Sequence, residues 1–238
     1  MIAAGMVVGG CADDHDDDGP LGSLDGGLDA GHVNDGSIDG GGDAGKRLGF
    51  FVSSATSPTG NLGGLAGADA RCRALAAAVG AGDRTWRAFL SVEKDGTKGG
   101  SPTAAGERIG AGPWYNAEGR LVAADLASLF MLTGDPALFI DEQGNRINGQ
   151  WSGSPSPNQH DILTGTLLDG GVALGKTCDD WTSATDASVA MVGHSDGLGP
   201  MEDRTPPRNS WYAAHDNAGC NDTLPLGGAG RIYCFAAD

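Results

Sequence analysis

Four cysteines in the second part of the chain are the residues best able to do chemistry: Cys72, Cys178, Cys220 and Cys234. Thiolates can act as nucleophiles, but an even set in a chain with features of export is better explained as two disulfides. Four cysteines allow three pairings, and their spacing does not choose among them. The sequence therefore predicts structural cross-links here and leaves their connectivity open.

A fifth cysteine, Cys11, stands apart from this set. It follows a short apolar run, Ile2–Val8, and the string Val8-Gly9-Gly10-Cys11 resembles a bacterial lipobox, in which small residues precede a lipidated cysteine. We expect residues 1–11 to be a lipoprotein-type signal segment with lipid on Cys11. The alternative is a free cysteine in a tail. No run of 18 apolar residues occurs, so the expected membrane contact is the lipid anchor alone.

Within residues 46–238, histidine and aspartate occur together in three short strings: His160-Asp161, His194-Ser195-Asp196 and His215-Asp216. The second holds all three side-chain types of a hydrolase triad, but such triads are assembled from separate segments. Neighbouring placement in Gly-rich loops favours turn chemistry instead. No hydrolase elbow, zinc-protease helix or phosphate-binding loop is present. The sequence thus predicts no catalytic residue, no metal ligand and no cofactor.

Aromatic side chains are the remaining candidates for ligand contact, because Trp and Tyr on loops anchor sugars and protein partners. We expect Trp151 and Trp181 to belong to the core. Trp211 and Tyr212 fall in a long loop region and are the predicted ligand-binding residues. The aromatic residues assigned to exposed loops or their borders are Trp114, Tyr115, Trp151, Trp181, Trp211 and Tyr212.

Short strands and one clear helix must position these residues. Leu48–Ser53 and Thr85–Val92 are typical of strands. Between them, Leu65, Ala68, Cys72, Leu75, Ala76 and Val79 share one face at helical spacing, and Gly80 is a natural stop. A second helix is predicted within residues 122–132. Long Gly- and Pro-rich connections elsewhere indicate a loop-rich α+β domain over residues 46–238.

Residues 12–45 differ from the rest of the chain, with ten Asp, ten Gly and no Lys or Arg. Such a segment buries too little apolar surface to offset its chain entropy, so a disordered tether is expected. Its Asp spacing lacks the order of a calcium-binding loop. The remaining 21 acidic residues against 15 Lys and Arg leave about −6 of the total charge of −16. That balance argues against nucleic acid as a partner.

Several segments together resemble a known family. Gly64–Cys72 followed by Thr85–Ser91 is similar to the helix–strand segment of endostatin, the C-terminal domain of certain collagens. Thr177–Ser183 resembles the segment of its second cysteine, and Gly219–Phe235 the final cysteine pair. The likeness runs from about Leu48 to Phe235, and a family of bacterial exported proteins with this endostatin-like domain is closer still.

The resemblance implies a C-type-lectin-like α+β fold, with two helices packed on a mixed antiparallel sheet, long loops and two disulfides. It also implies nested pairing, Cys72–Cys234 and Cys178–Cys220. Sequential pairing, Cys72–Cys178 with Cys220–Cys234, is the main competitor.

The familiar activities of these relatives are not expected here. The nearest string to a lectin calcium loop, residues 156–159, lacks the leading carboxylate or amide. The mild negative charge argues against sulfated glycans. Lys46 and Arg47 stand where endostatin carries zinc-binding histidines.

We therefore predict a non-catalytic, exported, lipid-anchored binding or adhesion module for an extracellular glycan or protein ligand. Its expected location is the bacterial cell envelope, as an outer-membrane lipoprotein that is periplasmic or surface-exposed. A cell-envelope hydrolase with an unrecognised site and a purely structural envelope protein are the alternatives.

Overall fold

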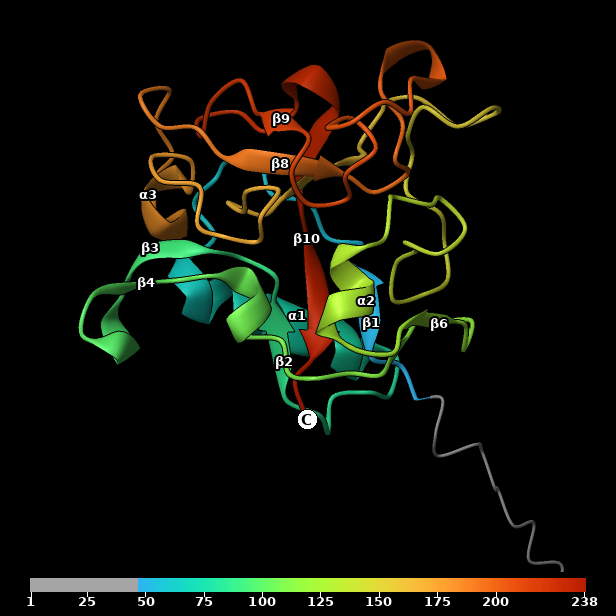
Figure 1. Cartoon of the computed structure of the whole chain (residues 1–238), viewed down its shortest axis with the longest axis horizontal. Coiled ribbons are helices and arrows are strands. Elements are labelled where there is room, and N and C mark those ends of the chain that lie inside the picture. The colour runs from blue at the N-terminus through green and yellow to red at the C-terminus, as the bar shows by residue number, and fades with distance from the viewer. Residues whose placement is uncertain (1–46) are drawn as a thin grey trace, which may run out of the picture. The chain divides into compact units, whose positions relative to one another are not determined.

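The computed structural model describes residues 47–238 (Figure 1). The signal segment predicted for residues 1–11, with its lipidated Cys11, and the tether predicted for residues 12–45 lie outside the described residues. Within residues 47–238, every helix is too short or too polar to span a bilayer.

A six-stranded mixed sheet organises the domain, and β10 lies at its centre (Figure 1). β10 pairs antiparallel with β1 along one edge. Along its other edge it pairs antiparallel with β2 and parallel with β7, and β8 and β9 continue antiparallel beyond β7. The strands are β1 (Phe50–Val52), β2 (Trp86–Ala88), β7 (Asp161–Leu163), β8 (Met191–His194), β9 (His215–Asp216) and β10 (Gly228–Ala236).

The core lies on both faces of this sheet because neighbouring strand residues point to opposite sides. Phe50 and Phe235 belong to one apolar cluster, which also contains Trp114 and Trp211. Phe51 packs in the other cluster, which contains both disulfides. Every residue of β10 except Arg231 is buried, as expected of a strand covered on both faces.

Helix α1 (Gly64–Ala78) covers one face of the sheet with small side chains. Its buried residues are Ala68, Cys72 and Ala76, four apart on one stripe, which confirms the predicted face. The stripe stops short of the predicted Val79, which is 39% exposed because the helix ends before it. Gly80 follows with φ +80°, a left-handed conformation that favours glycine at a helix end.

Two disulfides join the helices to the sheet and a loop, and their nested pairing is confirmed. Cys72 of α1 bonds Cys234 of β10 with a Cα separation of 5.4 Å, and Cys178 bonds Cys220 at 5.7 Å. The sequential alternative is wrong. The bridged residues are 162 and 42 positions apart. Chain-entropy arguments assign such bridges upper bounds of about 5 and 4 kcal/mol.

The turn α3 (Cys178–Trp181) has an unusual hand that the sequence did not predict. Its four non-glycine residues have φ values of 48°, 51°, 54° and 66°, so it is a left-handed turn. Such a conformation costs about 1–2 kcal/mol per residue. Three contacts hold the turn in place. Cys178 is bonded to Cys220, the Asp180 carboxylate accepts a hydrogen bond from the Glu93 amide at 2.6 Å, and the Trp181 indole donates one to the Ser91 carbonyl at 2.9 Å.

Shorter elements complete the domain, and some differ from expectation. The predicted strand 85–92 is interrupted shortly after β2. The Phe89 amide still bonds Tyr233 of β10, but the Leu90 amide bonds the Ala88 carbonyl and the Ser91 amide bonds the Thr164 carbonyl, away from β10. The predicted helix 122–132 is only α2 (Leu126–Phe130), which Asp125 caps. The remaining elements are β3 (Val92–Asp95), η1 (Gly96–Lys98), β4 (Ser101–Thr103), η2 (Ala105–Glu107), β5 (Trp114–Tyr115), β6 (Leu121–Ala123), η3 (Pro200–Glu202) and η4 (Pro225–Gly227).

Candidate metal centre

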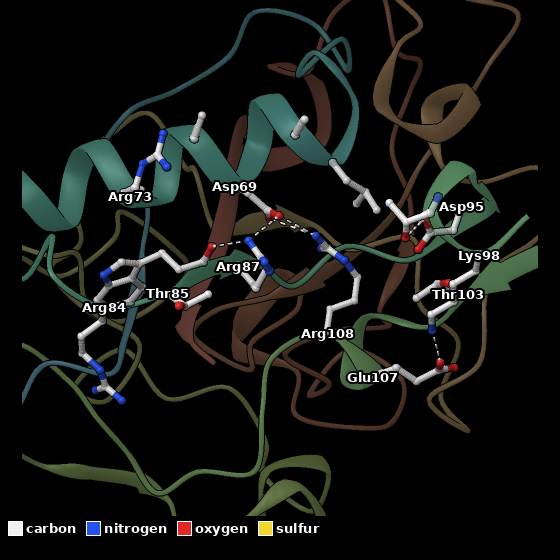
Figure 2. Close-up of a pocket in the computed structure, with 15 residues that line it drawn as sticks. Asp69, Arg73, Arg84, Thr85, Arg87, Asp95, Lys98, Thr103, Glu107 and Arg108 are labelled. Atoms are coloured by element: carbon white, nitrogen blue, oxygen red, sulfur yellow. Dashed lines mark hydrogen bonds and ion pairs between the residues drawn. The ribbon is translucent and has the colours of Figure 1, made fainter. Parts of the chain in front are cut away.

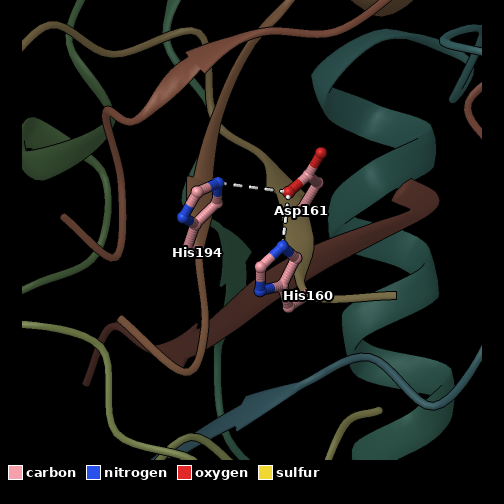
Figure 3. Close-up of side chains that lie close together, drawn as sticks. All are labelled: His160, Asp161 and His194. Atoms are coloured by element: carbon pink, nitrogen blue, oxygen red, sulfur yellow. Dashed lines mark ion pairs between the residues drawn. The ribbon is translucent and has the colours of Figure 1, made fainter. Parts of the chain in front are cut away.

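The three His–Asp strings converge on adjacent strands of the sheet. Asp161 begins β7 and lies directly opposite His194, the last residue of β8. His160 immediately precedes β7, and His215 begins β9, where it pairs with Val192 of β8. Sheet pairing therefore brings together side chains that are up to 55 positions apart in the sequence, as Figure 3 shows for His160, Asp161 and His194.

The Asp161 carboxylate is the centre of the group. His160 Nε2 lies 3.2 Å and His194 Nε2 lies 3.4 Å from Asp161 Oδ1, and His215 Nε2 lies 3.5 Å from Asp161 Oδ2. These separations exceed the roughly 2.7–2.9 Å of a charge-assisted hydrogen bond. Among the described residues, neither Asp161 oxygen nor His194 Nε2 has a hydrogen-bond partner, although all three atoms are buried. Burying a carboxylate without a hydrogen-bond partner costs folding free energy unless a cation lies beside it.

The opposite ring nitrogen of each histidine is held by an acceptor. Nδ1 of His160 lies 2.7 Å from Asp196 Oδ1, while His194 Nδ1 and His215 Nδ1 each lie 2.8 Å from a backbone carbonyl, of Arg208 and of Asp216. Since a carbonyl or a carboxylate accepts, each Nδ1 carries the proton and donates it. The lone pair of each neutral ring is then on Nε2, the atom near Asp161. Metal-ligating histidines have this second-sphere arrangement.

Burial shapes the protonation of the group. Desolvation, followed by the nearby His160, lowers the pKa of His194 to about 4, so its ring is neutral at pH 7. Burial alone would raise the pKa of Asp196, but hydrogen bonds from His160 and from two backbone amides lower it. The Asp161 carboxylate raises the pKa of His215. The His160 and His194 rings stack with centroids 4.3 Å apart.

This ligand set fits a transition metal. Zn–N bonds of about 2.0–2.1 Å place the ligand atoms of a tetrahedral site about 3.3 Å apart. The measured separations of 3.2 and 3.4 Å match that edge length, and one ligand atom from each of His160, Asp161 and His194 lies within 4.8 Å of the others. Imidazole suits zinc, copper, iron and nickel, whereas calcium takes six to eight oxygens.

A cavity of about 450 Å³ opens onto the rings of all three histidines. Arg208 lines it, and so do Gln150 and Asp216. Pro200, Pro207, Ala214 and Leu226 supply its apolar wall. The histidine group is therefore accessible from this cavity, and His215, with 31% of its side chain exposed, lines it.

The predicted ligand-binding residues Trp211 and Tyr212 lie elsewhere, and the exposure expected of them is wrong. Trp211 is fully buried and Tyr212 is 5% exposed. The Trp211 indole donates to the Leu129 carbonyl at 3.1 Å, and the Tyr212 hydroxyl to the Leu168 carbonyl at 2.8 Å. The segment that carries them packs closely against β8 at Gly193. A Cβ at position 193 would collide with the Trp211 carbonyl, so this close approach requires glycine. They are core residues with no ring face to offer a sugar.

The burial expected of the other tryptophans is found for some of them and not for others. Trp181 is fully buried, as predicted, but Trp151 is only half-buried, with the Arg146 guanidinium 5.5 Å above its ring. Trp114, also considered a loop residue, is fully buried and donates to the Ala236 carbonyl.

A second hollow, of about 690 Å³, lies between α1 and the β3–β4 hairpin (Figure 2). The Asp69 carboxylate accepts two bonds from Arg108, at 2.8 and 3.0 Å, and contacts Arg87 at 3.3 Å. Lys98 pairs with Glu107, and Arg84 with Asp238. Most basic side chains that line this hollow are thus paired with carboxylates, which indicates a structural role rather than a binding site for an anion.

Comparison with models of known protein families and with curated proteins found no match for this chain. The residues themselves define the class of site. It is a buried centre with two histidines and one carboxylate, a third histidine at its open side, and a cavity above it. Sequence reasoning treated these histidines as separate loop residues. The one signal that pointed to them was the recurrence of a histidine within two residues of an acid, three times between residues 160 and 216.

Proposed function

We propose that this chain is an exported, non-catalytic binding module built around a transition-metal centre, with zinc as the best-fitting ion. One observation carries the proposal: the Nε2 atoms of His160 and His194 meet at the buried, otherwise unsatisfied Asp161 carboxylate. Nδ1 of each ring is already hydrogen-bonded. Within the described part of the chain, the lone pairs on the two Nε2 atoms are therefore free to bind a cation beside the Asp161 carboxylate.

The proposed setting is the bacterial cell envelope, with Cys11 as a lipid anchor and a glycan or protein as the external ligand. Two disulfides support an oxidising, extracytoplasmic environment. The nested bridges and the helix tied to the last strand support an endostatin-like, C-type-lectin-like domain. The cavity over the histidines, rather than Trp211 and Tyr212, is the ligand surface that the geometry favours.

Metal titration of the chelator-treated full chain tests the proposal. We expect calorimetry and elemental analysis to show one tightly bound Zn²⁺ per chain. Asp161→Asn should weaken this binding at least tenfold, because it removes the only anionic ligand. Asp222→Asn is the matched control, since Asp222 is exposed and, within residues 47–238, its side chain bonds only the Leu224 amide. Any weak binding by the acidic residues 12–45 is common to all three proteins. Equal affinity in wild type and Asp161→Asn would refute the centre.

A metal-dependent envelope hydrolase is the second candidate, and the cavity favours it. Catalytic zinc keeps a position for water beside three protein ligands, and here a cavity reaches the rings. Turnover of an envelope polysaccharide or peptide that depends on added zinc and disappears in Asp161→Asn would support this reading over the binding module.

A further inference from the structure

We infer that His215 is the fourth ligand of the metal, so that His160, Asp161, His194 and His215 close the coordination sphere. This inference rests on the proposed metal centre and specifies its type. A zinc ion with four protein ligands is structural, whereas one with three keeps a reactive position. His215 thus decides between the two functions considered above.

Strand pairing places His215 on the correct side of the sheet. His215 lies opposite Val192, and His194 is two residues further along β8. Residues two apart on a strand share a face, and diagonal neighbours across a pair remain within reach of long side chains. The rings of His194 and His215 accordingly have centroids 5.0 Å apart, one edge toward the other.

The ligand atom of His215 is also prepared. Its Nδ1 donates to the carbonyl of Asp216 at 2.8 Å, so its Nε2 carries the lone pair, as in His160 and His194. That Nε2 lies 3.5 Å from Asp161 Oδ2, the second oxygen of the same carboxylate, so a short movement of the ring brings it to an ion held at Oδ1.

His215 differs from the other two histidines in its freedom to move. The His160 and His194 side chains are at most 3% exposed, whereas that of His215 is 31% exposed beside the cavity. It lies next to the compact group of three rather than within it. The geometry therefore describes three pre-positioned ligands and a fourth whose ring moves a short way to cover the ion.

If His215 completes the coordination sphere, the cavity beside the histidines need not be a reaction site. With His215 on the ion, the cavity ends on the outer faces of the imidazole rings, and no ligand reaches the metal. The ion then acts as a cross-link between β7, β8 and β9, whose contacts are otherwise a few short ladders.

Cobalt substitution of the full chain tests the inference. Tetrahedral Co²⁺ absorbs visible light more strongly than Co²⁺ with more ligands, and azide changes the spectrum only where it can bind the ion. We expect the wild-type Co²⁺ protein to show strong absorption that azide leaves unchanged. His215→Ala should bind Co²⁺ at least about tenfold more weakly, a loss comparable to or larger than that of removing a second-sphere partner. Its spectrum should respond to azide.

His32→Ala is the matched control, because His32 lies outside the predicted domain, and circular dichroism of His215→Ala verifies its fold. His215→Gln gives a second variant with a side chain of similar size. A folded variant that binds no Co²⁺ also supports the ligand role. A wild-type spectrum that responds to azide, with unchanged affinity in both His215 variants, overturns the inference but leaves the metal centre standing. Absence of Co²⁺ and Zn²⁺ binding in wild type refutes the centre itself.

Discussion

His160 Nδ1 donates to Asp196 Oδ1 across 2.7 Å, between two side chains that are almost completely buried. The Asp196 carboxylate is itself held by the backbone amides of Gln150 and Leu198, at 2.6 and 3.0 Å. This chain of bonds fixes both the orientation and the tautomer of the His160 ring. Asp196 thus positions a metal ligand without touching the ion.

Asp196→Asn is therefore expected to raise the Zn²⁺ dissociation constant about 10- to 100-fold, the usual cost of losing such a partner. Competition against a fluorescent chelator measures it. Asp203→Asn serves as the control, because Asp203 lies in a neighbouring loop and bonds Thr205 and Arg208 rather than a histidine ring. An unchanged constant in Asp196→Asn would mean that His160 does not ligate the ion.

Acid should destabilise the metal-free protein. The pKa of buried His194 is about 4 in the folded state and about 6.5 in the unfolded state. Between these values the unfolded chain binds the proton more readily, so stability falls as the pH drops from about 6.5 to 4. The loss from this ring is at most about 3 kcal/mol. The lowered pKa of Asp196 acts in the same direction, and the raised pKa of His215 opposes both.

Urea unfolding at pH 7 and pH 5, with chelator present, measures this effect. His194→Gln should flatten the dependence over that interval because it removes the shifted group. A slope that is the same in wild type and variant would show that His194 is protonated in the folded protein.

Trp211→Ala should destabilise the fold by about 3–5 kcal/mol, because it empties the centre of one core cluster. The ring packs edge-on against Tyr233 at 5.1 Å and lies 4.8 Å from Phe89. Thermal and chemical unfolding give the loss. Leu168→Ala, at a position 57% exposed, is the comparison and should change stability little. A stable Trp211→Ala protein with impaired glycan binding would restore Trp211 as a ligand residue.

Asp69→Ala should cost about 3 kcal/mol, because it leaves buried donors without their acceptor. Those donors are the Arg108 guanidinium, of which 10% is exposed, and the Ala88 amide at 2.9 Å. Asp83→Ala removes an exposed partner of Arg47 and should have little effect. Equal denaturation midpoints for the two variants would contradict the scaffold role of Asp69.

Local patterns predicted the elements that local physics governs. The apolar stripe of α1 and the aromatic strand β1 follow from periodicity and composition, and both are present. The split of the strand after Ala88 and the left-handed turn at Cys178 do not follow from them. Tertiary bonds decide both features, since Ser91 bonds Thr164, and the turn is held by a disulfide to Cys220.

The sequence predicted the cysteine pairing only in part. An even number of cysteines predicted two bridges, but three connectivities were open. The resemblance to endostatin selected the nested one, and the Cα separations of 5.4 and 5.7 Å agree with it.

By itself, the sequence determined a loop-rich α+β domain with two cross-links, its first strand and its main helix, because these depend on residue type and short-range spacing. Only the tertiary structure decided which aromatic rings are buried and that three histidines share one carboxylate. Strand order and register bring His160, Asp161, His194 and His215 together, and both are set by contacts between segments far apart in the chain. No local pattern around any one histidine contains that information.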